Sequence, residues 1–92
     1  MAILVKSVLP GITTDQYDAL NSRLQALPGD TFAGCISHAC VPTGSGLEIY
    51  DLWESEEAMR KFTGIVMPIA RDMGLPPGAQ PEVHQTHAHW TP

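Results

Sequence analysis

The sequence predicts a single α+β domain in which two helices cover one face of a four-stranded antiparallel sheet. The chain has 92 residues, which is the size of one domain. Four stretches are rich in apolar and β-branched residues, and two others repeat apolar residues at helical spacing. Along residues 1–92 these elements follow the order β-α-β-β-α-β.

A strand and a helix are predicted in the first 30 residues. Residues 1–9 are apolar and β-branched, and Pro10 and Gly11 end them, which favours a strand. Thr13 and Gln16 fit a capping box at the start of a helix. An apolar stripe at helical spacing follows: Tyr17, Leu20, Leu24 and Leu27.

A β-hairpin is predicted next. Residues 33–41 and 47–54 form its strands, and residues 42–46, which contain Pro and two Gly, form its turn. Because side chains alternate along a strand, Asp51 shares a face with apolar neighbours, namely Leu47, Ile49 and Trp53. An acid among apolar side chains is the first indication of a site.

A second helix and a last strand complete the order. Ser55 suits the N-cap, and one apolar stripe marks the helix: Ala58, Phe62, Ile65, Ile69 and Met73. Pro68 is expected to kink or split this helix. Residues 82–90 are predicted to form the last strand. The completed order is that of ferredoxin-like folds, which leave one sheet face open, and a symmetric homodimer would cover that face.

The composition and charge of the chain limit the classes of molecule that it is expected to bind. The net charge is −5 and the five Lys and Arg residues are scattered, which argues against nucleic-acid and anionic-membrane partners. No stretch approaches the ~20 apolar residues of a membrane helix. Cys35 and Cys40 lie five residues apart on one predicted strand, so their side chains are expected on opposite faces without a disulfide. We therefore expect a reducing, cytoplasmic setting.

The hairpin register can be estimated from its turn. A loop of two or four residues around Gly44 and Ser45 gives the same pairing parity. Directly opposed residues share a sheet face. Three such pairs follow: His38 with Asp51, Ile36 with Trp53, and Cys40 with Ile49.

The pairing of His38 with Asp51 has two interpretations. An imidazole oriented by a carboxylate can transfer protons, whereas the same pair can also be a purely structural hydrogen bond. Trp53 can form a flat wall with one N–H donor for a ring substrate, or it can be a core or dimer contact. Ile36, Ile49 and Phe62 are expected to line the same substrate site.

Further polar candidates lie at the two ends of the chain. His87 and His89 share a face of the predicted last strand and can add a polar group to the site, bind a metal or face solvent. Because CxxC and HExxH patterns are absent, no metal is predicted. Lys6, within an apolar strand, can anchor a carboxylate or phenolate, or extend to solvent from a strand edge.

The chain resembles the dimeric α+β barrel superfamily, near its antibiotic biosynthesis monooxygenase-like group. The resemblance rests on AILVKSVLPG with its following Thr-capped helix, on ISHA, and above all on DLWESEEAMRKF, and it covers essentially the full chain. It implies a homodimer whose sheets form a barrel, with a pocket inside the barrel or between each sheet and its helices. By analogy it implies cofactor-independent oxidation of polycyclic phenols, polyketide cyclisation, or isomerase and lyase chemistry.

The sequence also departs from two groups of that superfamily. Haem-degrading relatives carry an iron-ligating His on the second helix, and residues 55–73 contain none. A plant polyketide cyclase pairs a His near the second helix with an acid near its C-terminus. Here that His is missing and His89 falls where the acid would be, although the ending His-Trp-Thr-Pro resembles its Asp-Tyr-Thr-Pro ending. Neither mechanism therefore carries over.

The sequence thus predicts a small-molecule enzyme of the monooxygenase-like type without a cofactor. Base-assisted proton abstraction would start the oxidation of an aromatic or polyketide-like substrate. The predicted catalytic residues are His38, Asp51, His87 and His89, and the predicted substrate contacts are Trp53, Ile36, Ile49, Lys6 and Phe62. The alternatives are a cyclase or isomerase of the same fold, a non-catalytic ligand-binding dimer, and a metal enzyme that uses the predicted catalytic set.

Overall fold

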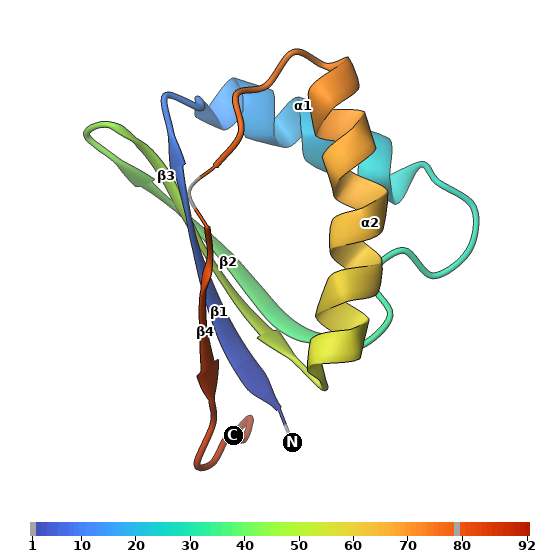
Figure 1. Ribbon diagram of the computed structural model, residues 1–92, viewed down its shortest axis with the longest axis vertical. Coiled ribbons are helices and arrows are strands. Elements are labelled where there is room, and N and C mark those ends of the chain that lie inside the picture. The colour runs from blue at the N-terminus through green and yellow to red at the C-terminus, as the bar shows by residue number, and fades with distance from the viewer. Residues whose placement is uncertain (1, 79) are drawn as a thin grey trace.

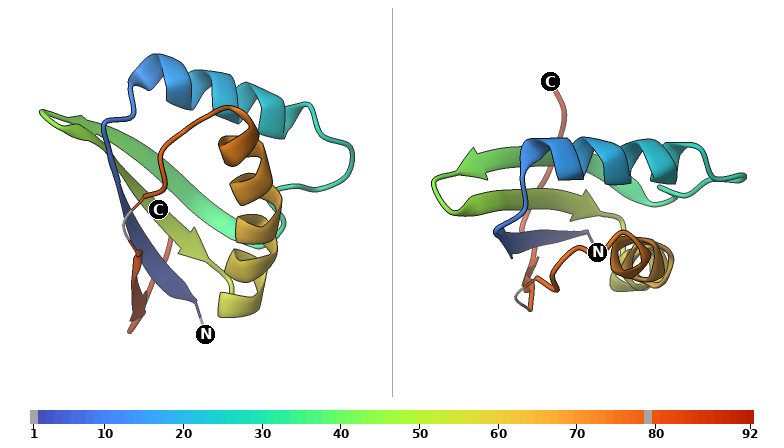
Figure 2. Two further views of the ribbon diagram at one scale, coloured as in Figure 1. Left: turned by 45° about the horizontal axis from the view of Figure 1, so that its top comes forward. Right: turned by 90° about the horizontal axis from the view of Figure 1, so that it is seen from above.

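A computed structural model describes residues 2–78 and 80–92 and confirms the predicted order and fold class. Its strands and helices are β1 (Ile3–Pro10), α1 (Thr14–Gln25), β2 (Cys35–Thr43), β3 (Gly46–Trp53), α2 (Glu56–Asp72) and β4 (Glu82–Gln85). The sheet order is β2-β3-β1-β4, and each neighbouring pair is antiparallel. Both helices lie on the same side of this sheet (Figures 1 and 2).

The helix starts follow the sequence signals. The Thr13 hydroxyl accepts the Gln16 N–H at 3.1 Å, and the Gln16 side chain accepts the Thr13 N–H at 2.9 Å, which completes the capping box of α1. The Ser55 hydroxyl caps α2 in the same way, by accepting the Ala58 N–H at 3.1 Å. α2 is not split at Pro68, because the chain remains helical through to Asp72.

The hairpin register is confirmed in its centre and wrong at one end. His38 pairs with Asp51, and Cys40 with Ile49, as the two-residue turn requires. A bulge between Cys35 and Ser37 then gives the position opposite Trp53 to Cys35 instead of Ile36. The bulge also brings Cys35 and Cys40 to the same sheet face, contrary to the expectation from simple alternation, and both thiols are free.

Gly46 is a glycine whose conformation and surroundings both exclude a side chain. It lies at φ 155°, and a Cβ atom there would come 2.3 Å from the carbonyl oxygen of Leu9 and 3.0 Å from the Cα of Pro10. Gly46 pairs with Pro10 at the end of the β1–β3 ladder. Neither neighbouring atom can move without moving the backbone of β1.

We therefore expect Gly46→Ala to lower the free energy of unfolding by roughly 1–3 kcal/mol, from local strain and the displaced end of β1. Urea denaturation followed by circular dichroism measures this loss. Gly44→Ala is the matched control, because nothing lies within 4 Å of a Cβ at that position. Equal stability of the two variants would show that the end of the β1–β3 ladder can shift to accommodate a Cβ atom without loss of stability.

The core lies between the sheet and the helices. Along β3, every second residue is buried, from Leu47 to Trp53. Trp53 is 2% exposed and clusters with Ile3 and Val5, against which Phe62 of α2 also packs. The opposite sheet face carries Lys6, which pairs with Tyr50, and exposes apolar side chains such as Leu4.

The last strand is shorter than predicted. β4 ends at Gln85, and the next residue, Thr86, still donates its backbone N–H and its hydroxyl to the Ala2 carbonyl, at 3.2 and 2.8 Å. The prediction of a strand through residue 90 was therefore wrong, and His87 and His89 are exposed residues beyond the sheet. None of the helices in the described ranges is long and apolar enough to cross a membrane.

Candidate functional site

A histidine and an acid meet on the face of the sheet that the helices cover. His38 of β2 and Asp51 of β3 are directly opposed, and Nδ1 of His38 forms a hydrogen bond with Oδ1 of Asp51. The Asp51 side chain is 12% exposed, whereas that of His38 is 40% exposed. Among the described residues, Asp51 is the one polar or charged residue that is buried. The acid is therefore an anchor within the sheet, and the imidazole is the accessible member of the pair.

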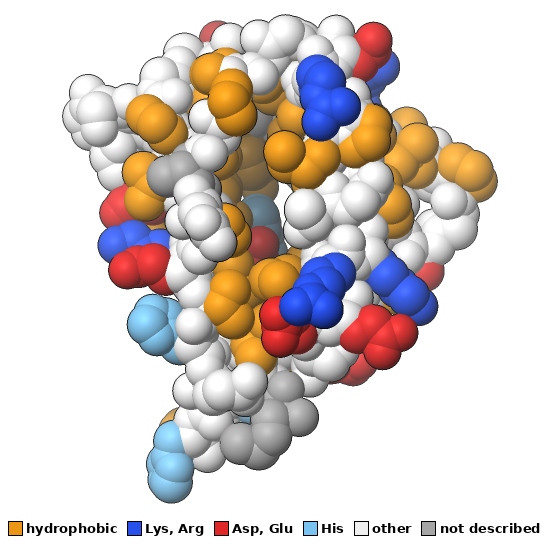
Figure 3. Space-filling view, in the orientation of Figure 1, with side chains coloured by type: hydrophobic (Ala, Val, Ile, Leu, Met, Phe, Trp, Pro, Cys, Tyr) orange, Lys and Arg blue, Asp and Glu red, His pale blue; other side chains and the backbone are white. Residues whose placement is uncertain are grey.

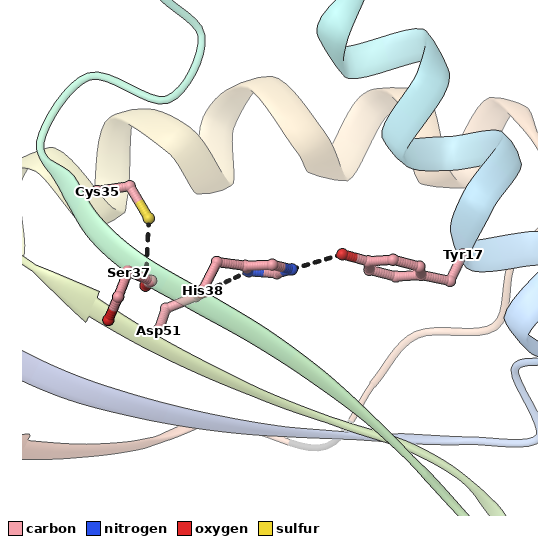
Figure 4. Close-up of polar contacts among 5 residues, drawn as sticks. All are labelled: Tyr17, Cys35, Ser37, His38 and Asp51. Atoms are coloured by element: carbon pink, nitrogen blue, oxygen red, sulfur yellow. Dashed lines mark hydrogen bonds and ion pairs between the residues drawn. The ribbon is translucent and has the colours of Figure 1, made fainter.

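A third polar group comes from α1. The Tyr17 hydroxyl lies 2.5 Å from Nε2 of His38, and the two rings are nearly coplanar, at 7°, with centroids 6.0 Å apart (Figure 4). An ionised Asp51 accepts the Nδ1–H of a neutral imidazole, so Nε2 keeps its lone pair and accepts the Tyr17 hydroxyl proton. Three elements thus form one continuous chain of hydrogen bonds.

Tyr17 was not among the predicted site residues, because it belongs to the apolar stripe of the first helix. The available signal was the hydroxyl, because a partly buried Tyr usually finds a hydrogen-bond partner. The stripe gives the face of α1 that meets the sheet. It does not give the strand position across from each residue, which depends on how the helix lies on the sheet.

The neighbouring charges move the protonation of His38 and Tyr17 in a definite direction. The hydrogen bond to Asp51 raises the pKa of His38, although burial opposes the shift. Burial raises the pKa of Tyr17, and the negative charges of Cys40, Asp51 and Asp18 add to that shift. The site therefore favours a protonated tyrosine beside an imidazole that is more basic than usual.

Aromatic side chains close one end of the space between sheet and helices. The rings of Trp53 and Phe62 lie 5.2 Å apart, and those of Phe62 and Phe32 lie 5.5 Å apart. At 2% exposure Trp53 belongs to the core, which was one of its two predicted roles. Phe62 is only partly buried and lies between this core and the open space.

The helices do not fill all of the space over the sheet face that carries His38 and Asp51. No residue of α2, all of which is described, is buried, although Ala58, Met59 and Phe62 pack against the core. The space-filling view shows a hollow beside α2, with histidine and acidic colours at its floor (Figure 3). Two shallow grooves of about 330 and 270 Å³ lie elsewhere, at the β2–β3 turn and at the start of α2.

Only some of the other predicted site residues share the sheet face of His38 and Asp51. Lys6 lies on the opposite sheet face, so the structure does not bring it together with His38. Ile36 is 37% exposed at the bulge, and Ile49 is buried beside Asp51 on β3. Within residues 2–78 and 80–92, no three His, Cys, Asp or Glu side chains are grouped to hold a metal, so His87 and His89 do not complete a ligand set with His38.

Solved structures share this fold over nearly the full chain. Protein YjcS has a TM-score of 0.64 at 13% identity, with 95% of this chain and 100% of that one covered. Rv0793 from Mycobacterium tuberculosis has a TM-score of 0.58 at 20% identity, with 98% of each chain covered. A protein from Chloroflexus aurantiacus, provisionally described as an antibiotic biosynthesis monooxygenase, has a TM-score of 0.58 at 16% identity, with 98% of each chain covered.

A second protein with the same provisional description, from Deinococcus radiodurans, has a TM-score of 0.59 at 12% identity and covers 99% of this chain and 97% of its own. No family model and no curated protein matches the sequence. At these identities the likeness shows the fold. The chain therefore has the ferredoxin-like α+β fold found in structures described as antibiotic biosynthesis monooxygenases.

Proposed function

We propose that this protein is a small-molecule enzyme of the antibiotic biosynthesis monooxygenase-like type, which abstracts a proton from an aromatic or polyketide-like substrate. The observation that carries the proposal is the His38–Asp51 pair, in which a buried carboxylate orients an accessible imidazole. A carboxylate in this position fixes the tautomer and increases the basicity of the ring, as a general base requires. The hollow beside α2 gives a substrate access to this face (Figure 3).

The proposed reaction needs only the substrate and molecular oxygen. A phenol-activated CH₂ group loses one proton to the base, and the resulting carbanion transfers electrons to O₂. The CH₂ group becomes C=O, one oxygen atom enters the product, and the other leaves as water. The protein's part is to take the first proton and to hold the anion in an apolar space, next to side chains such as Phe62.

The proposal includes a homodimer. The sheet face away from the helices exposes three apolar side chains, namely Leu4, Val8 and Val41, at 40%, 41% and 43%. A second copy of the chain placed with its sheet against this face would remove these side chains from water. The site on the helix side would then lie outside the contact between the two sheets.

Ligand binding without catalysis is the second candidate. It is favoured by the position of the pair on the helix-covered face and by the Tyr17 hydroxyl, which already occupies Nε2 of His38. A storage site for an apolar ligand, however, has no need for three polar groups that converge on one point. The two candidates make opposite predictions for turnover.

We expect His38→Ala to reduce proton abstraction at least ~100-fold, because the general base is removed. The probe is 1,8-dihydroxyanthrone, a tricyclic phenol with an acidic CH₂ group, and the measurement is oxygen uptake in air-saturated buffer. His84→Ala, an exposed histidine on β4, is the matched control and is expected to keep full activity. Retained turnover in His38→Ala excludes the base role, and tight probe binding without turnover in the wild-type protein favours the second candidate.

A further inference from the structure

Both ring nitrogens of His38 already have hydrogen-bond partners. Nδ1 is bonded to Asp51 and Nε2 to the Tyr17 hydroxyl. The side chain is nevertheless 40% exposed. A substrate that enters the hollow therefore cannot reach a nitrogen of His38 unless Tyr17 moves away.

The Tyr17 oxygen, in contrast, has capacity left. A phenolic hydroxyl donates one hydrogen bond and accepts up to two, and Tyr17 uses its donor toward His38. Tyr17 lies on α1, is half-buried and points from the helix across the space toward β2 (Figure 4). Its oxygen is the end of the hydrogen-bond chain that begins at the Asp51 carboxylate.

We propose that Tyr17 is the group that contacts the substrate, and that His38 and Asp51 are positioning residues that act through it. This inference rests on the proposed function and changes how its first step occurs. The substrate proton forms a new O–H bond to Tyr17 while the original Tyr17 proton moves to Nε2 of His38. The substrate keeps the electron pair of its broken bond, His38 becomes an imidazolium, and Asp51 stays ionised throughout.

The surrounding charges explain why the two proton transfers belong together. Tyr17 is a poor base on its own, because burial and the negative charges of Asp51, Cys40 and Asp18 disfavour the tyrosinate. His38 accepts the proton readily, because Asp51 favours the imidazolium form. Tyr17 thus never carries a full negative charge when the proton moves through it to His38.

The same exchange also supplies a donor for the product anion. After the transfer, the Nε2–H of the imidazolium donates to the Tyr17 oxygen, and the new Tyr17 O–H points toward the substrate. The substrate anion then accepts a hydrogen bond from Tyr17, with the positive charge of His38 one bond further away. This is the role that the sequence had suggested for Lys6, which lies on the other face of the sheet.

Tyr17→Phe separates this relay from direct action by His38. The variant keeps the His38–Asp51 pair and leaves Nε2 open. If His38 acts directly, the variant is as active as the wild-type protein or more active. The relay instead predicts a loss of at least ~100-fold, because the group that exchanges protons with the substrate is gone. Tyr50→Phe is the matched control, because Tyr50 lies on the opposite face and bonds Glu48 at 3.3 Å.

The measurement is deuterium incorporation into the CH₂ group of 1,8-dihydroxyanthrone in D₂O without oxygen, which reports proton abstraction apart from oxidation. Only the Tyr17 proton comes from the solvent, because the CH₂ proton has not exchanged before the step. In H₂O–D₂O mixtures the relay therefore predicts a rate of proton abstraction that falls linearly with the deuterium fraction, a signature that a merely structural tyrosine would not produce. Wild-type exchange without oxygen uptake overturns the proposed oxidation but still tests Tyr17. Exchange that survives in Tyr17→Phe overturns the relay alone, and a wild-type protein without exchange overturns both.

Discussion

Trp53→Ala is expected to lower the free energy of unfolding by about 3–5 kcal/mol, which is the range for removing a large aromatic side chain from a packed core. Trp53 is 2% exposed and is one of the three largest fully buried side chains of the described chain. It packs with Ile3 and Val5 of β1 and with Phe62 of α2, so its loss leaves a cavity where the sheet meets the helix. A domain of this size has only about 5–15 kcal/mol of total stability, so the variant should be close to unfolding.

The measurement is a urea titration followed by far-ultraviolet circular dichroism. Trp90→Ala is the matched control, because Trp90 is 78% exposed and is expected to change stability by less than about 0.5 kcal/mol. A cooperative transition for Trp53→Ala at the wild-type midpoint would show that this indole is not the centre of the core. Trp53→Phe should retain more stability, because its ring still fills part of the site.

Asp51→Asn is expected to lower the free energy of unfolding by about 1.5–3 kcal/mol in mildly acidic buffer, the range for hydrogen bonds that involve a charged group. The lower end applies, since the His38 side chain is 40% exposed. The variant should also lower the pKa of His38, because the hydrogen bond that raises it loses its charge while burial still opposes the imidazolium.

The pH dependence of this loss has a definite sign. Asp51 raises the pKa of folded His38 above its unfolded value of about 6.5. The stabilisation of the imidazolium is therefore fully present below pH ~6.5 and is lost as the pH rises through the folded-state pKa. The stability difference between the wild-type protein and Asp51→Asn should shrink in alkaline buffer.

Urea titrations at several pH values measure that difference, and nuclear magnetic resonance of the imidazole carbons follows the pKa of His38 directly. The control is a double-mutant cycle, in which Asp51→Asn is repeated in the His38→Ala background. There the pH-dependent part of the loss should disappear. If it persists, the pH dependence belongs to another group, and the coupling of His38 with Asp51 does not control it.

The centre of the hairpin was predictable because a short turn and strict alternation leave little freedom. Once Gly44 and Ser45 form the turn, His38 falls opposite Asp51 and Cys40 opposite Ile49. The bulge between Cys35 and Ser37 was not predictable, because one extra residue in a strand leaves no recognisable signal in the local sequence. The last strand was overestimated for a similar reason: residues up to 90 fit a strand, but β1, with which β4 pairs, begins at Ile3 and its pairing with β4 ends at Gln85.

Two of the three polar residues of the proposed site were therefore visible in the sequence. His38 and Asp51 belong to one hairpin, so local rules bring them together. Tyr17 comes from a helix 21 residues away in sequence, and only the way in which α1 lies over the sheet determines that it meets His38. The orientation predicted for His87 and His89 was wrong, because it depended on a strand that stops at Gln85.

The strand order also limits which strands can pair first while the chain is being synthesised. β1 is synthesised first but lies between β3 and β4, which both come later, whereas β2 and β3 can pair as soon as their turn emerges. The apolar residues of β1, such as Ile3 and Val5, have no strand to pair with until β3 has been synthesised. The hairpin with His38 and Asp51 is thus able to form early, and the site is completed only when β1 joins the sheet and α1 brings Tyr17 into place.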